Sequence, residues 1–235
     1  MKRKYLLTLT FFAAMAGNLS ALEILEPFSL GILTHFEVMY GRIFPENEKQ
    51  QNYFEFVAGG GITENFSYLF SGSAASNFRS IENVGLNFIW QFISSSNFAG
   101  CLIPHAAFIA EEDQKLTAYY DLGAYLQLHL FALKVIQPYL GAGYSYTQNR
   151  KESDDYLWTI PLFCGIMAPI GETGINIFGQ FTTEPCKGGK WDNIERYAAI
   201  GINYEIIENF ELITEGGYEF TNRETRIIAG VHIDL

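Results

Sequence analysis

The chain has 235 residues, with 26 acidic and 15 basic side chains and a formal net charge of −11 at pH 7. This charge disfavours nucleic acid as a partner. Only 17% of the residues are charged whereas 16% are aromatic, which disfavours a soluble secreted domain and favours one with extensive apolar surface.

The first residues predict an export signal. A basic start, Met1 to Lys4, precedes an apolar run over residues 5–16, and small residues follow. This order describes a secretory signal peptide, and the run is too short for a membrane-spanning helix. We therefore expect a signal peptide over residues 1–21, with cleavage after Ala21 favoured and cleavage after Ala16 as the alternative.

The remainder, residues 22–235, is expected to be one domain. It has no uninterrupted apolar segment of about 18 residues, so no membrane-spanning helix is predicted. The three cysteines, Cys101, Cys164 and Cys186, lack the spacing of a metal site and are interpreted as small buried or lipid-facing residues. We expect no metal and no cofactor.

Alternating side chains predict strands along the whole domain. The expected strands cover about residues 30–43, 53–61, 66–72, 83–92, 98–110, 120–130, 138–147, 156–168, 175–182, 197–206, 210–219 and 225–235. Those over 98–110 and 156–168 are apolar on both faces, so their facing is left unassigned. Outward aromatic residues such as Tyr68, Trp90 and Trp158 are expected to form girdles at the two membrane interfaces.

The stretch over residues 120–147 shows the alternation most clearly. Leu122, Leu126 and Leu130 share an apolar face, while Asp121 and His129 lie on the opposite, polar face. A period of two with one apolar and one polar face suits a strand between lipid and a wet lumen. The same pattern in most other strands disfavours a soluble sandwich or lipocalin-like barrel.

The length of the domain indicates the number of strands. If 214 residues remain after cleavage at Ala21, twelve strands of about ten residues leave connections of about eight. Eight strands would require connections of about 17 residues, and no polar stretch of that length occurs. We predict an all-β fold: a transmembrane antiparallel up-and-down β-barrel of about 12 strands, with 10 or 8 as alternatives, in the outer membrane of a diderm bacterium.

Three stretches carry a resemblance to known proteins. They are the run Gln137 to Tyr144, the segment Ile160-Pro161-Leu162 followed by Gly165, and the alternating C-terminal strand. They resemble the small outer-membrane β-barrel proteins, the OmpA/OmpX-type group in its broad sense. The resemblance implies outer-membrane lipids and the barrel-assembly machinery as partners. Two features depart from it, because many members have eight strands and end in an aromatic residue, whereas this chain ends in Leu235.

The expected interior is rich in carboxylates. The side chains predicted to line it are His35, Glu37, Glu55, Asp121, Gln127, His129, Glu205, Glu211, Glu215, Glu219, Arg226, His232 and Asp234. Such a lumen favours cations. It predicts a small, porin-like passive channel for small hydrophilic solutes, or else a structural barrel filled by paired side chains.

Two other functions remain as alternatives. A basic and aromatic patch in a predicted external loop, Lys187, Lys190 and Trp191, suggests contact with an anionic headgroup or a partner, as in a surface-exposed adhesin. A lipid-modifying hydrolase would require a nucleophilic serine beside a histidine, and no serine is evidently paired with His105. We therefore expect no enzymatic activity.

Overall fold

The computed structural model describes residues 35–46, 50–75, 81–109, 119–131, 135–149, 156–185, 195–221 and 223–234, and the regular elements in these ranges are β-strands. They are β1 (His35–Pro45), β2 (Gln51–Thr63), β3 (Phe66–Ala75), β4 (Ile81–Ser94), β5 (Phe98–Ile109), β6 (Tyr119–Leu130), β7 (Gln137–Asn149), β8 (Tyr156–Thr159), β9 (Leu162–Pro169), β10 (Ile175–Glu184), β11 (Glu195–Ile207), β12 (Phe210–Glu219) and β13 (Glu224–Asp234). In these ranges no helix is long and apolar enough to cross a membrane. The predicted leader, residues 1–21, lies outside them.

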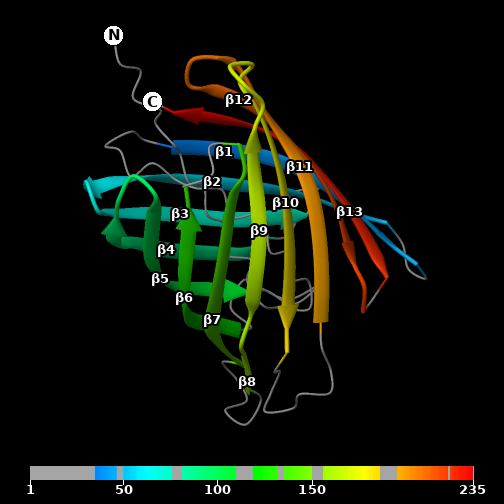
Figure 1. The fold of residues 1–235 in the computed structure, drawn as a ribbon. Coiled ribbons are helices and arrows are strands. Elements are labelled where there is room, and N and C mark those ends of the chain that lie inside the picture. The colour runs from blue at the N-terminus through cyan, green and yellow to red at the C-terminus, as the bar shows by residue number, and fades with distance from the viewer. Residues whose placement is uncertain are drawn as a thin grey trace.

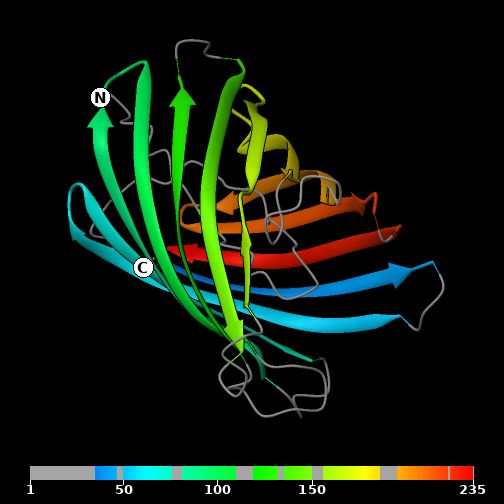
Figure 2. The ribbon, with the colours of Figure 1, turned by 90° about the horizontal axis from the view of Figure 1, so that it is seen from below.

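The strands form one antiparallel sheet that closes on itself. β1 pairs with β13 along its whole length, from His35 opposite Asp234 to Pro45 opposite Glu224. The pairing of β6 with β7 joins the two remaining edges of the sheet. In Figure 2 the red β13 lies beside the blue β1, so the first and last strands of the described chain are neighbours. The predicted antiparallel up-and-down barrel is confirmed.

β8 and β9 together make one barrel strand. Both pair with β7, and they are separated by Ile160 and Pro161. Proline has no backbone N–H to donate, so the regular pairing is interrupted at Pro161. Its carbonyl still accepts a hydrogen bond from Gly143 N at 2.8 Å, which keeps this segment attached to β7. The barrel therefore has twelve strands, as predicted, and the alternatives of ten and eight strands are wrong.

The two walls of the barrel cross steeply. In Figure 1, β1 to β5 run across the view, whereas β7 and β9 to β11 run down in front of them. Strands that tilt strongly about a common axis have this appearance, since closing a sheet into a barrel requires a tilt of about 35–45°.

Alternate side chains face opposite sides of the wall. On β6, Leu122, Leu126 and Leu130 are 44–49% exposed on the outer face, whereas Asp121 and His129 on the inner face are fully buried. The outer face is the apolar one because lipid, unlike water, does not penalise exposed hydrocarbon.

The structure also orients the two strands whose facing the sequence left open. On β5, Cys101, Ile103 and His105 face inward, and Phe108 faces outward. On β9, Phe163 faces inward with 4% of its side chain exposed. Both strands place apolar residues inside the barrel, which explains why their two faces look alike in the sequence.

Several inward glycines lie directly opposite an inward ring on the neighbouring strand. Gly41 faces Tyr53 across β1 and β2, and a Cβ at Gly41 would lie 2.1 Å from Cζ of that ring. Gly143 faces Tyr125 in the same way, with 2.2 Å to Cδ1. The absent side chains let the rings lie flat against the wall, so large aromatic residues fit inside.

Short turns join the strands at one end of the barrel. Residues 64–65 and 208–209 are two-residue turns, each preceded by an irregularity in the register of its hairpin. In the turn over residues 170–174, Gly171 and Gly174 adopt φ of +57° and +74°, a conformation that suits glycine. The connections at the other end all include residues outside the described ranges.

Candidate functional site in the barrel interior

The inner face of the barrel carries many carboxylates and few cations. Among the described side chains, the inward acidic residues are Glu37, Glu55, Asp121, Glu184, Glu205, Glu211, Glu215, Glu219, Glu224 and Asp234. The inward guanidinium among the same side chains is that of Arg226. The interior is therefore strongly acidic over the part of the chain that the structure describes.

One charged cluster lies at the end of the barrel where the short turns and the described chain ends are. The strand register places Glu37, His232 and Glu211 in one row across β1, β13 and β12. His232 Nδ1 donates a hydrogen bond to Glu37 Oε1 at 2.8 Å, and its Nε2 lies 3.2 Å from Oδ1 of Asp234. Each nitrogen of this buried ring thus faces a carboxylate.

A second charged cluster lies toward the opposite end, on β11 to β13. The Tyr197 hydroxyl donates to Glu215 Oε1 at 2.8 Å, and Cζ of Arg226 lies 5.6 Å from the centre of the Tyr197 ring. Arg226 also lies 3.7 Å from Glu224, and it is 2% exposed. The guanidinium therefore stacks on an aromatic ring within a group of carboxylates.

A third cluster is centred on Asp121, on the wall formed by β5 to β7. Its Oδ2 lies 2.9 Å from His105 Nε2, and its Oδ1 accepts hydrogen bonds from Ser145 Oγ at 2.5 Å and Thr147 Oγ1 at 2.7 Å. The His105 ring stacks on Tyr125 with 4.8 Å between centres. These contacts hold both oxygens of the carboxylate.

This third cluster differs from a hydrolase triad. In a triad the imidazole lies between the serine and the carboxylate, so that it can accept the serine proton. Here the carboxylate of Asp121 lies between His105 and Ser145. Ser145 donates to an acid rather than to the histidine, and the arrangement gives no support to the hydrolase alternative.

Neutral polar side chains continue the inner surface on β6, β7 and β10. Gln127 contacts the ring of His129, which stacks on Tyr139 at 5.3 Å. The Tyr139 hydroxyl donates to Gln180 Oε1 at 2.8 Å, reaching across β9. Both Gln127 and His129 are fully buried.

An apolar belt lies among these polar clusters. It consists of Met39, Ile43, Tyr53, Val57, Leu69, Ile89, Cys101, Ile103, Tyr125, Tyr139, Phe163 and Ile228. On the inward face of β13, the apolar Ile228 lies between the charged Arg226 and the polar His232. The belt therefore separates the two charged clusters along this strand. The sequence analysis did not predict this belt, because the lining of the interior was inferred from the polar residues alone.

Apart from His35, the predicted lining residues have their side chains on the inner face of the sheet. Glu205 is the exposed one, because it lies where β11 meets its turn. His35, in β1, is paired with Asp234 of β13, and only the backbone of His35 is described. The external-loop residues Lys187, Lys190 and Trp191 lie outside the described residues.

Sequence reasoning missed two inward acids and the partners of His105. Glu184 and Glu224 continue the inward periods of β10 and β13, and the alternation alone would have found them. The link between His105 and Asp121 depends on the facing of β5, which the sequence left open.

Of the cysteines, Cys101 is buried inside and Cys164 is exposed outside, while Cys186 is not among the described residues.

Comparison with solved structures defines the class of fold. The NanC porin superposes with a TM-score of 0.65 at 11% identity, covering 85% of this chain and 100% of that chain. The KdgM porin in complex with disordered oligogalacturonate gives 0.62 at 12% identity, covering 85% and 99%. An outer-membrane channel from Pseudomonas putida F1 gives 0.59 at 9% identity, covering 86% and 95%.

These similarities show that the chain has the fold of the outer-membrane β-barrels. No protein-family model matches the sequence, and no curated protein matches it. The expected resemblance to this broad group is confirmed, and no narrower family is identified.

Proposed function

We propose that this protein is an outer-membrane channel for small cations. The observation that carries the proposal is the imbalance of inward charge, with the carboxylates named above set against the guanidinium of Arg226. A pore lined by carboxylates attracts cations and repels anions. The fold supports the proposal because the barrels it resembles include two porins and a channel.

The charge of the interior also separates this chain from one of those proteins. The KdgM porin structure holds oligogalacturonate, a sugar chain with one carboxylate per residue. Glu215, Glu219 and Glu224 would repel such a chain at one end of this barrel, and Glu37 and Glu211 at the other. The solute proposed here is therefore cationic, and acidic oligosaccharides are excluded.

The packing of the interior restricts the solute to small ions. Glu37, Asp121 and Gln127 have no exposed surface, so no water-sized space adjoins them. The apolar belt adds a hydrophobic constriction, which limits the entry of water and ions. We expect low conductance and no passage of oligosaccharides.

Planar-bilayer recording tests this function. The purified barrel is expected to give small, discrete current steps, and its reversal potential in a KCl gradient should show preference for K⁺. Glu215→Gln and Glu219→Gln should each reduce that preference, whereas Glu172→Gln, in an exposed turn at the other end, should leave it unchanged. Anion preference in the unmodified protein would contradict the proposal.

A barrel without a conducting path is the second candidate, favoured by the same complete burial of Glu37 and Asp121. It predicts a folded protein, inserted in the bilayer, that shows no current steps.

The surface-interaction alternative concerns the loop over residues 184–195, which holds Lys187 and Trp191. It requires binding to cells or lipid that is lost when this loop is exchanged.

The fold supports the proposed outer-membrane location, and the processing of the leader is a prediction. We propose that the mature protein starts at Leu22 after cleavage of residues 1–21, and that the assembly machinery and the lipids of the outer membrane are its partners. Mass spectrometry of protein from isolated outer membranes should give the mass of residues 22–235. A mass starting at Gly17 would favour cleavage after Ala16 instead.

A further inference from the structure

The described side chains on the outward face of the strands carry very little charge, and the charge they carry is positive. Among the described side chains, the ionised groups on the outer faces of the strands are the guanidinium groups of Arg42 on β1 and Arg196 on β11. Arg223 follows in the turn between β12 and β13, where its side chain is 66% exposed. No outward carboxylate occurs among the described side chains of the strands.

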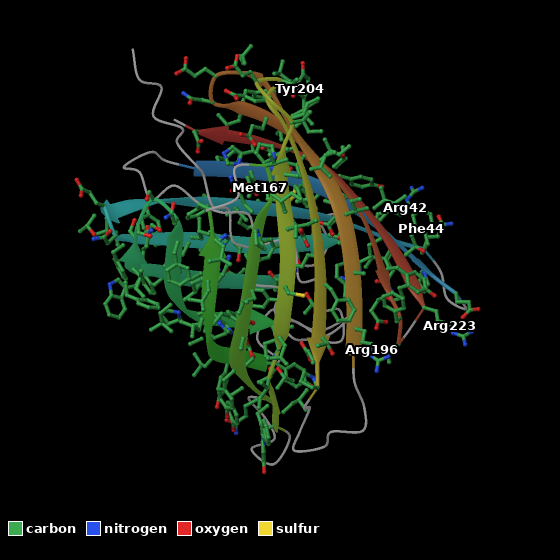
Figure 3. The ribbon with its side chains drawn as sticks, viewed as in Figure 1. Arg42, Phe44, Met167, Arg196, Tyr204 and Arg223 are labelled. Atoms are coloured by element: carbon green, nitrogen blue, oxygen red, sulfur yellow. The ribbon has the colours of Figure 1, made fainter. Side chains whose placement is uncertain are left out.

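The three arginines lie on one side of the barrel, near one rim. Figure 3 shows Arg42, Arg196 and Arg223 on the same side of the barrel, with Arg196 and Arg223 far from Tyr204, which lies near the opposite end of β11. This is the rim opposite the short turns. The register places β12 and β13 between Arg196 and Arg42.

The outer surface between the arginines is apolar and aromatic. Tyr218 and Phe220 are 39% and 50% exposed, and their rings meet edge to face at 5.0 Å. Ile227, opposite Arg42 in the register, is 53% exposed. Hydrocarbon chains of a lipid can lie on this surface while its headgroup meets the guanidinium groups.

Two contacts orient the Arg42 side chain. Its Nε donates to Asn52 Oδ1 at 2.6 Å, and its Cζ lies 5.9 Å from the centre of the Phe44 ring. Its terminal nitrogens have no hydrogen-bond partner within the described residues. Arg223 meets Glu46 at 3.2 Å, but this pair is exposed and therefore weak, so an anion can compete for it.

A guanidinium on the lipid-facing side needs an anion. At the bilayer midplane such a charge costs about 2–4 kcal/mol, and near the interface the cost falls to about 0–1 kcal/mol. The position of these arginines near a rim is consistent with the interface, where lipid phosphates lie. Arginine binds phosphate through parallel hydrogen bonds, and the bond is stronger for a charged acceptor.

We propose that Arg42, Arg196 and Arg223, with Tyr218 and Phe220, form a binding site for a glycolipid that carries two phosphates on its sugar headgroup. The site rests on the proposed placement in the outer membrane, with this rim at the outer leaflet. Lipid A has this chemistry.

The width of the site selects this occupant over a simple phospholipid. Arg42 and Arg196 are three interstrand spacings apart and offset by four residues along the strands. This separation corresponds to roughly 20 Å between their Cα atoms. One phosphodiester headgroup reaches one of these arginines, whereas a disaccharide with a phosphate at each end and several acyl chains occupies the whole surface between them.

Native mass spectrometry of the refolded protein in detergent micelles tests the site. The probes are bisphosphorylated lipid A, lipid A without phosphates, and phosphatidylglycerol. The unmodified barrel is expected to retain bisphosphorylated lipid A in preference to both others. Arg42→Gln and Arg196→Gln should each weaken retention about tenfold, and the double variant about a hundredfold.

Matched variants separate the site from a general effect of charge. Glu172→Gln with Glu208→Gln changes two charges at the opposite end and should leave retention unchanged. Arg42→Lys keeps the charge but loses the parallel hydrogen bonds, and should give an intermediate affinity. Circular dichroism of each variant verifies that it is folded.

Two results would overturn the inference. Equal retention by the double variant would show that the arginines do not bind lipid, and arginine-dependent retention of phosphatidylglycerol at the level of lipid A would show that the ligand is a phospholipid. The proposed channel is tested separately, because Arg42 and Arg196 lie outside the lumen. The double variant should keep the K⁺ preference of the unmodified protein, and either property can fail while the other stands.

Discussion

At the level of single residues, the inside of this barrel depends on contacts that tolerate little change in size or charge. Inward rings lie across glycines of the neighbouring strand, and buried carboxylates meet specific donors. Gly41 and Tyr53 represent the first kind of contact, and Glu37 and His232 the second. Each leads to a prediction about stability.

Adding a methyl group at Gly41 should destabilise the barrel. The Cβ of Gly41→Ala would lie 2.1 Å from Cζ of Tyr53, and relief of such an overlap typically costs about 1–3 kcal/mol. Urea unfolding in lipid vesicles, followed by tryptophan fluorescence, measures the loss. Gly216→Ala is the matched control, because nothing lies within 4 Å of its Cβ position. Equal loss in both variants would show that the ring contact is unimportant.

Removing one side of the buried pair at β1 and β13 should also destabilise the protein. Glu37 is fully buried and its Oε1 lies 2.8 Å from His232 Nδ1. Glu37→Ala should lower the free energy of unfolding by about 3 kcal/mol, since it leaves a buried polar ring with one partner fewer. The same unfolding assay applies. Glu208→Ala, in an exposed turn, should change the stability by less than about 0.5 kcal/mol, and a similar loss there would argue against a specific role for the pair.

At the level of the strands, the sequence predicted most elements because lipid and lumen impose opposite demands on alternate residues. The prediction was weakest where that contrast is lost. Ile103 and Phe163 contribute to the apolar belt inside the barrel, so β5 and β9 are apolar on both faces. β3 is longer than expected, because backbone pairing continues to Ala75 through the polar Ser73.

The candidate site could be predicted only in part for the same reason. The inward acids Glu211, Glu215 and Glu219 of β12 and Asp234 of β13 followed from the period of two. The hydrogen bonds around Asp121 could not be predicted, because they join three strands and require the register of β5, β6 and β7. Alternation specifies the face of a residue, whereas pairing specifies its neighbour.

Cysteine cross-linking tests the strand pairing that closes the barrel. Val38 and Val231 are directly opposite on β1 and β13 and both face outward. Directly paired residues come close enough for a disulfide. With the three native cysteines replaced by alanine, Val38→Cys with Val231→Cys should therefore form an intramolecular bond on oxidation, detected by a mobility shift.

The matched control moves one cysteine by a single strand. Leu212 is the partner of Val231 on β12, so it lies about two interstrand spacings, roughly 10 Å, from Val38. Val38→Cys with Leu212→Cys should remain reduced. Efficient cross-linking in the control, or none in the direct pair, would show that β1 and β13 do not meet in this register.

At the level of the whole molecule, two surfaces of opposite character are separated by one layer of backbone. Leucine and aromatic side chains cover the outside, while carboxylates, hydroxyls and an apolar belt fill the inside. Because the sheet closes on itself through β1 with β13 and β6 with β7, the stability of such a barrel is shared among its strands. This predicts cooperative resistance to detergent.

Electrophoresis without boiling provides the measurement. The folded barrel should remain compact in sodium dodecyl sulfate and migrate faster than the boiled chain. Its circular dichroism should show mainly β-structure. Solubility without detergent is incompatible with a barrel whose outer face meets lipid, and a predominantly helical spectrum is incompatible with the β-barrel itself.

The break at Ile160 and Pro161 gives one strand two different environments. β9 has β7 on one side and β10 on the other, whereas β8 pairs with β7 and has no second partner strand among the described residues. Since no described strand lies on its other side, we expect the amide protons of β8 that point away from β7 to lack the protection that a second neighbour provides. Deuterium uptake should therefore be fast over residues 156–159 and slow over residues 162–169, and the boundary between the two rates should fall at the proline.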